Sequence, residues 1–227
     1  MSCRVLIGSI RSQIPTNSQS LPLIDLMSSA YADYFPITHH IHARISFIRR
    51  LGPRPGRLAC YDCHMIRAGI LTVSDAGSRG EREDTSGAAI RELLVGIGGE
   101  IGRYEIVPDE RDVIAAKLRD WCDAGGIDLI LTTGGTGLAA RDVTPEATLA
   151  VAERQAPGIA EAMRAEGMRH TPKAMLSRAV AVVRGSTLII NLPGSEKGVR
   201  ESLGAVLDVL PHAVELLQGV TDHPKTS

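Results

Sequence analysis

Aromatic residues, cysteines and long apolar runs are scarce in this chain of 227 residues. Only 3% of the residues are aromatic and four are cysteines, which are too few for a fold held together by disulfides. No apolar run approaches the roughly 20 residues of a membrane-spanning helix, and the N-terminus lacks the basic-then-apolar order of a signal peptide. The formal net charge is -1 and no basic stripe is present, so the chain lacks the usual signature of a protein that binds nucleic acid or an anionic membrane. We therefore expect a cytoplasmic protein that acts on small molecules.

The composition changes at Met65. Residues 1–64 hold five of the seven aromatic residues and neither lysine nor glutamate, whereas the later chain uses both freely. The early segment shows no sustained helical or strand period. We interpret 1–64 as a poorly ordered extension that stems from a mis-assigned start, 65–219 as the main domain and 220–227 as a polar tail. Mass spectrometry of the native protein tests the start: an N-terminal peptide that begins ahead of Met65 would contradict it.

One short motif lies in this extension, at Cys60–His64. Its C-x-x-C-H spacing matches a c-type haem attachment site, and the same side chains with His39, His40 or His42 could form a zinc site. No export signal accompanies the motif, and no second spaced pair of ligands follows in an ordered context. We therefore interpret it as a coincidence. A colourless purified protein would exclude the haem.

Strand-like and helix-like segments alternate after Met65. We expect strands at residues 67–74, 103–107 and 127–133, and helices at residues 85–97, 111–123, from 144 to a break at 156–158, and 159–166. A hairpin of residues 179–183 and 187–191 adds an antiparallel strand, and the last helix follows residues 193–195. Thr144 is expected as the N-cap residue, with Pro145 at the first helical position. The order predicts a three-layer α/β/α domain with a mainly parallel sheet.

Four turns at the predicted strand ends carry glycines or polar side chains. They comprise residues 74–80, 108–110, 132–137 and 191–195. Ligands of such sheets bind outside the carboxyl ends of the strands, so we expect these turns to surround one ligand. Glycines let backbone N–H groups approach a phosphate, Thr133 and Thr136 add hydroxyl donors, and Ser195 precedes a helix N-terminus that forms a second anion site.

Two acidic residues lie on different turns, Asp109 and Asp142. They could share a magnesium ion or orient a nucleophile, while Arg141 could neutralise a phosphate. Simpler interpretations stay open: the glycines only reverse the chain, each aspartate caps the helix that follows, and Ser177 is an ordinary loop residue. The chain has no P-loop lysine motif and no G-x-G-x-x-G motif, which disfavours the common nucleotide-binding folds.

Taken together and in order, these segments resemble the MogA/MoaB family of molybdenum cofactor biosynthesis proteins. The blocks that carry the resemblance are Leu71–Asp75, Val107–Glu110, Leu131–Gly137, Arg141–Thr148, Met175–Arg178 and Ile190–Ser195. The resemblance runs from about Ile66 to Gly219 and leans toward the molybdopterin adenylyltransferases of the MogA type and the G domain of gephyrin. It implies a MogA-like, molybdopterin-binding fold and a homotrimer.

The resemblance also implies an activity and a set of site residues. The activity is transfer of AMP from Mg-ATP to the terminal phosphate of molybdopterin, with release of pyrophosphate. The two functional acids of the family correspond to Asp109 and Asp142, as catalytic residues and as ligands of Mg²⁺. The substrate-binding positions that follow from the same match are Ser74, Asp75, Thr132, Thr133, Gly134, Gly135, Thr136, Gly137, Arg141, Asn191, Pro193, Gly194 and Ser195. Ser177 is implied to contact the pterin.

This chemistry agrees with the residues, because joining two anionic phosphates requires charge neutralisation and orientation rather than a covalent intermediate. Three alternatives compete with it: a MoaB-like molybdopterin-binding paralogue with weak or no catalysis, a noncatalytic scaffold module, and the molybdate-insertion enzyme. The presence of both Asp109 and Asp142 disfavours the first, and the length of the chain disfavours the other two. We expect the molybdate-insertion enzyme as a partner instead.

Overall fold

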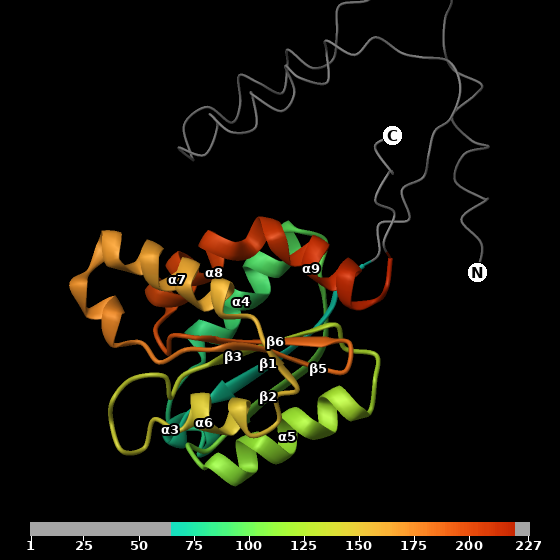
Figure 1. The fold of residues 1–227 in the computed structure, drawn as a ribbon. Helices are drawn as coiled ribbons and strands as arrows, with labels where there is room; N and C mark the ends of the chain where they lie inside the picture. Colours follow the sequence, from blue (N-terminus) through green and yellow to red (C-terminus); the bar gives the residue numbers. More distant parts are fainter. Residues whose placement is uncertain (1–64, 221–227) are drawn as a thin grey trace, which may run out of the picture. The chain divides into compact units, whose positions relative to one another are not determined.

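Parallel strands linked by helices organise residues 65–220, the part of the chain that the computed structural model describes (Figure 1). The predicted extension, its Cys60–His64 motif and nearly all of the predicted tail fall on residues 1–64 and 221–227, outside the described part. Those predictions and the domain boundaries therefore stay predictions. Within residues 65–220, no helix combines the length and the apolar character that crossing a membrane demands.

The sheet has six strands in the order β2-β1-β3-β6-β5-β4. Their bounds are β1 Arg67–Val73, β2 Glu100–Val107, β3 Leu129–Thr133, β4 Arg154–Gln155, β5 Ala181–Arg184 and β6 Thr187–Leu192. Strands β2, β1, β3 and β6 run parallel, while β5 pairs antiparallel with both β6 and β4. This confirms the predicted parallel sheet and hairpin. The short edge strand β4 was predicted wrongly: its two exposed residues carry no periodic signal and fell within the helix expected from residue 144 to 156, which ends at Leu149.

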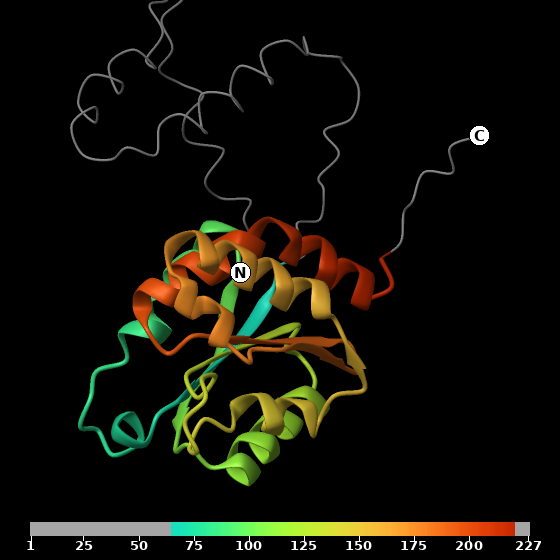
Figure 2. The same ribbon diagram turned by 60° about the vertical axis from the view of Figure 1, so that its left-hand side comes forward.

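Helices cover both faces of the sheet, which confirms the predicted three-layer α/β/α architecture (Figures 1 and 2). The helices are α3 Asp75–Ser78, α4 Thr85–Gly96, α5 Arg111–Asp123, α6 Thr144–Leu149, α7 Pro157–His170, α8 Glu196–Val206 and α9 Leu210–Leu217, with 3₁₀ turns η1 Pro172–Leu176 and η2 Leu207–Val209. In both views α4, α7, α8 and α9 lie on one face, and α5 and α6 lie on the other.

Two apolar cores result from this layering, one on each face of the sheet. Successive residues of the central strands enter opposite cores: Ile70 packs with α4 and α8, and Leu71 packs with α5. In β3, Leu131 lies in the same core as Ile70, and Ile130 lies in the same core as Leu71. All four side chains are fully buried. Each contributes roughly 1.5–3 kcal/mol by burial, and both faces are covered, so these strands are continuously apolar rather than alternating.

The prediction that Thr144 is the N-cap of α6 is wrong. Val143 holds that position without a side-chain cap, and Thr144 is the first helical residue. The glycine turn explains the difference, because the backbone N–H of Thr144 donates to the carbonyl of Gly135 at 3.1 Å. The hydroxyl of Thr144 is packed beneath that turn, buried and without a partner in residues 65–220.

Candidate active site

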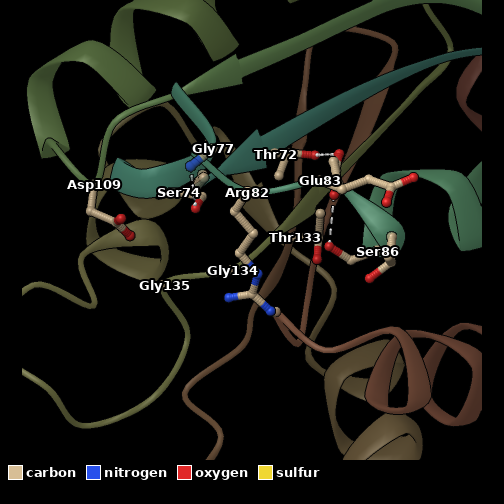
Figure 3. Close-up of a pocket in the computed structure, with 14 residues that line it drawn as sticks. Thr72, Ser74, Gly77, Arg82, Glu83, Ser86, Asp109, Thr133, Gly134 and Gly135 are labelled. Carbon is tan, nitrogen blue, oxygen red and sulfur yellow. Dashed lines mark hydrogen bonds between the residues drawn. The ribbon is translucent and has the colours of Figure 1, made fainter. Parts of the chain in front are cut away.

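The turns that follow β1, β2, β3 and β6 meet at one edge of the sheet, as the parallel order requires. Ser74 N–H donates to the carbonyl of Val107 at 2.9 Å, and Gly134 N–H to that of Leu192 at 3.3 Å. Between the turns lies a cavity of about 200 Å³, which we call the polar cavity (Figure 3). It is lined by Thr72, Val73, Ser74, Gly77, Arg82, Glu83, Asp84, Thr85, Ser86, Asp109, Thr133, Gly134, Gly135 and Gly194.

The turn after β3, Gly134–Gly137, needs glycine for steric reasons. Gly134 and Gly135 have φ values of 99° and 61°, a region that other residues rarely adopt. A Cβ on Gly134 would overlap the carbonyl oxygen of Val73, and one on Gly194 would lie 3.1 Å from the Cα of Gly134. The turn therefore reverses the chain and also brings bare backbone to the wall of the polar cavity.

Asp75 and Asp109 tie the turns after β1 and β2 together. The N–H of Asp75 donates to the carboxylate of Asp109 at 2.8 Å, and the N–H of Asp109 donates to that of Asp75 at 3.0 Å. The guanidinium of Arg141 contacts both oxygens of Asp75, at 2.8 and 2.7 Å, and this pairing lowers the pKa of Asp75. Asp75 thus remains ionised and holds Arg141 beside Asp109.

Asp109 occupies a different electrostatic environment. Burial raises the pKa of its carboxyl group, and the negative charges of Asp75 and Asp142 add to the rise. The hydrogen bond from the N–H of Asp75 and the charge of Arg141 oppose it. A cation close to Asp109 would therefore stabilise its ionised form. The N-cap position of α5 belongs to Glu110 and has no side-chain hydrogen bond, so the alternative that Asp109 caps α5 is contradicted.

Asp142 lies on the other side of the glycine turn. Its carboxylate accepts the N–H of Ala139 at 2.8 Å and does not cap α6, which contradicts the capping alternative for this residue too. One of its oxygens is 2.8 Å from the position of a Cβ on Gly137, while an oxygen of Asp109 is 3.4 Å from that of a Cβ on Gly135. The two carboxylates therefore flank the turn.

The side chains of the site can be compared with the ligands that a magnesium ion requires. Residues 65–220 contain no cluster of three or more histidine, cysteine, aspartate or glutamate side chains suited to a metal. Mg²⁺ is commonly held by one or two carboxylates together with substrate phosphates. Asp109 and Asp142 are the carboxylates that could serve such an ion, and the described residues form no cluster that would bind a metal by protein ligands alone.

A second cavity of about 340 Å³ involves the later part of the same turn. It is lined by Thr136, Gly137, Gly167, Thr171, Lys173, Ala174, Leu176, Ser177, Pro193, Ser195, Lys197, Gly198, Glu201 and Ser202. Thr133 to Gly135 line the polar cavity, whereas Thr136 and Gly137 line the second one. The glycine turn therefore contributes to the walls of both cavities, and Ser177 lies in the second.

Five predicted site residues line neither of these cavities. Asp75, Arg141 and Asp142 lie outside them, and Thr132 and Asn191 lie beneath the turns. Both are completely buried. The amide of Asn191 donates to the hydroxyls of Thr132 and Thr148, each at 2.9 Å, and its oxygen accepts the N–H of Val180 at 3.3 Å. Thr133, which does line the polar cavity, donates to the carbonyl of Pro193 at 2.7 Å. These groups join β3, β6 and α6 beneath the turns.

Asp84 lines the polar cavity but was not among the predicted site residues. Its carboxylate accepts hydrogen bonds from the hydroxyls of Thr72, Ser86 and Tyr104, at 2.5, 2.9 and 2.8 Å, and from the N–H of Gly87 at 2.8 Å. Burial acts to raise the pKa of Asp84, but these bonds outweigh it and lower the pKa. An aspartate directly before a helix is an N-cap signal, and it could have revealed this position.

Arg178 ends one of the sequence blocks that match the family, and no role was predicted for it. In the structure it holds the loop that carries Asp142. Its side chain donates to the carbonyl of Gly137 at 2.7 Å and to the carbonyl of Asp142, and it pairs with Glu146. Its own N–H donates to the carbonyl of Thr136 at 2.9 Å. The partners are mainly backbone groups distant in sequence, so no local pattern indicates them.

At one edge of a parallel α/β sheet, two carboxylates flank a glycine turn, and this turn lines two cavities. The arrangement defines a small-molecule site suited to phosphorylated ligands. Residues 69–212 match the family model described as "Probable molybdopterin binding domain", and the chain belongs to this family. The motifs of the sequence indicated the same family, and this resemblance is confirmed.

Named relatives agree with this assignment. The chain is 47% identical over 156 residues to a molybdopterin adenylyltransferase of Helicobacter pylori strain J99, covering 68% of this chain and 89% of that protein. The corresponding enzyme of Escherichia coli K12 is 39% identical over 168 residues, covering 68% and 86%. Among solved structures, the molybdopterin biosynthesis enzyme MoaB of Thermus thermophilus is 62% identical with a TM-score of 0.65, covering 68% of this chain and 98% of that one.

Proposed function

We propose that this protein is a molybdopterin adenylyltransferase, a nucleotidyltransferase that transfers AMP from Mg-ATP to the terminal phosphate of molybdopterin in molybdenum cofactor biosynthesis. The observation that carries the proposal is the position of Asp109 and Asp142, whose carboxylates flank a glycine turn shared by two cavities. Joining two phosphorylated substrates requires two adjoining binding spaces and metal-binding groups close to the reacting phosphates. The names of the relatives support the same activity.

The proposal assigns one substrate to each cavity. The polar cavity, with the glycine turn, Ser74 and Asp109 in its wall, takes the phosphates of the nucleotide. The second cavity takes the pterin next to Ser177, and its lysines, Lys173 and Lys197, supply positive charge to the terminal phosphate. The reacting phosphates then meet along Gly135–Gly137.

The reaction joins an oxygen of the molybdopterin phosphate to the α-phosphorus of ATP. The bond from that phosphorus to the bridging oxygen breaks, and the electron pair leaves with pyrophosphate. When bound, Mg²⁺ supplies neutralising charge to the phosphate oxygens. Asp109 and Asp142 orient the bound nucleotide, and Asp75 keeps Arg141 beside them. No strong base is needed, because the attacking phosphate is an anion at neutral pH.

The proposal also includes a cytoplasmic homotrimer that passes its product to a molybdate-insertion enzyme. These features rest on the family resemblance. Three apolar side chains that are 51–66% exposed, Leu138, Met175 and Leu176, offer surface to a neighbouring subunit. Sedimentation of the purified protein tests the trimer, and a monomer at micromolar concentration would contradict it.

The decisive experiment is incubation with molybdopterin, Mg²⁺ and labelled ATP, followed by a search for adenylylated pterin. We expect one equivalent of pyrophosphate for each pterin adenylylated. If folded protein binds the pterin but forms no product, the transferase assignment fails in favour of a pterin-binding paralogue. That outcome is a specific one to look for, since the relative at 62% identity is named MoaB rather than adenylyltransferase.

A further inference from the structure

The polar cavity contains a guanidinium group that the proposed reaction leaves without a role, that of Arg82. Among residues 65–220, it is the only basic side chain that lines this cavity. It forms no ion pair or side-chain hydrogen bond with any residue of that described part, whereas nearby Arg79 pairs with Glu81 at 2.8 Å. Figure 3 shows the Arg82 side chain extended into the cavity toward the turn at Gly134.

The backbone on both sides of Arg82 is held in place. Before it, the N–H of Gly80 donates to the carbonyl of Gly77 and that of Glu81 to the carbonyl of Ala76, both at 2.9 Å. After it, Asp84 is anchored by the four hydrogen bonds described above. The loop thus presents the guanidinium from a constrained backbone, which lowers the entropic cost of binding a ligand there.

The charge of the cavity indicates what Arg82 binds. Glu83, Asp84 and Asp109 also line the cavity, so three carboxylates face one basic group. A polyphosphate would add more negative charge to this space, and a divalent ion at Asp109 offsets only part of it. A guanidinium adds one further positive charge, in a planar fork that matches phosphate oxygens.

The position of Arg82 indicates which phosphates of a nucleotide it can contact. The transferred phosphate must lie at the border of the two cavities, because the acceptor phosphate enters from the second one. Arg82 lines only the polar cavity. The turn toward which it points, Gly134–Gly137, lines both cavities. Arg82 is therefore suited to the phosphates that lie farther from the acceptor.

We propose that Arg82 binds the β- and γ-phosphates of Mg-ATP and stabilises the pyrophosphate as it leaves. This inference rests on the proposed function and adds a binding residue to it. When the bond between the α-phosphorus and the bridging oxygen breaks, its electron pair stays on that oxygen. The positive charge of Arg82 faces the pyrophosphate on which this negative charge develops.

Calorimetric titration of the full-length protein with Mg-ATP and with AMP tests the inference. In Arg82→Gln, we expect the affinity for Mg-ATP to fall about tenfold, since a hydrogen bond to a charged group is lost, while the affinity for AMP changes less than about twofold. Arg82→Lys should recover part of the loss. Arg79→Gln is the matched control from the same loop, and it should bind Mg-ATP as the wild type does.

The outcomes separate the two proposals. If the wild type forms product while Arg82→Gln binds Mg-ATP with unchanged affinity, the inference about Arg82 is overturned and the proposed function stands. An equal loss of affinity for Mg-ATP and AMP overturns the assignment to the outer phosphates. A wild type that neither binds ATP nor forms product overturns both. Arg82 is exposed, so its variants should fold normally, and a thermal melt tests this expectation.

Discussion

Replacing Arg178 by alanine should separate the positioning of the catalytic loop from the stability of the fold. Its guanidinium donates to two carbonyl groups, those of Gly137 and Asp142, on the loop that carries one of the two flanking carboxylates. Hydrogen bonds from a charged donor contribute about 1.5–3 kcal/mol each. The side chain is 33% exposed, so water can partly replace it and the lower figure applies. The free energy of unfolding should fall by about 3 kcal/mol.

The effect on catalysis should exceed what instability explains. Without Arg178, the carbonyl groups of Gly137 and Asp142 lose the donor that connects them, and the Asp142 carboxylate moves relative to the glycine turn. A displacement of about 1 Å can reduce the rate about 100-fold. We therefore expect the kcat for AMP transfer to fall about 100-fold at a temperature where the variant is still folded.

Arg184→Ala is the matched control. Arg184 also pairs with a carboxylate, that of Asp123 at 2.8 and 2.9 Å, and donates to a backbone carbonyl, that of Val151 at 3.2 Å. It lies at the opposite end of the sheet, beside the hairpin between β5 and β6. Urea unfolding and steady-state kinetics should show a comparable loss of stability in both variants but a loss of kcat only in Arg178→Ala. Equal kcat values in the two variants would refute the reasoning.

Three further predictions concern the same edge of the sheet. Asp142→Asn should abolish adenylyl transfer and leave the circular dichroism spectrum intact; wild-type turnover would show that its carboxylate has no part in the reaction. Gly134→Ala should lower the melting temperature and reduce the free energy of unfolding by about 2 kcal/mol or more, because φ is 99° and the new Cβ overlaps the carbonyl oxygen of Val73; an unchanged melting curve would contradict this. The hydrogen bonds of Asp84 lower its pKa from an ordinary value of 3.8, so its stabilisation is present above that pH and is lost as the pH falls through the lowered folded-state pKa. Urea unfolding of Asp84→Asn between about pH 3 and 7 should show a weaker acid dependence than the wild type, and identical profiles would count against this role.

Much of the fold could be predicted because local signals and tertiary packing agree. Helix α5 begins and ends where its apolar period and following glycines indicate, at Arg111 and Asp123. The hairpin of β5 and β6 was indicated by two β-branched runs around a short polar turn. Strand β2 begins at Glu100, three residues earlier than predicted, since its exposed alternate residues weaken the apolar signal.

The site was predictable where its residues follow strands directly. Parallel strands bring their carboxyl ends to one edge, so the convergence of the turns that carry Asp75, Asp109 and Gly134 follows from strand order. By contrast, Thr132 and Asn191 belong to the same sequence blocks but point into the protein. Adjacent residues of a strand face opposite sides, and sequence blocks do not record which side a ligand occupies.

The sequence by itself determined the family, the alternation of strands and helices, and the two aspartates that flank the glycine turn, because each of these depends on local order along the chain. Only the tertiary structure decided how the turn takes part in two cavities, that Asp75 holds Arg141, that Arg178 supports the Asp142 loop, and that Arg82 enters the polar cavity without a partner among the described residues. These features are contacts between segments far apart in sequence. Their partners are side chains, backbone groups and a cavity that only folding brings together, so they leave no pattern in the order of the residues.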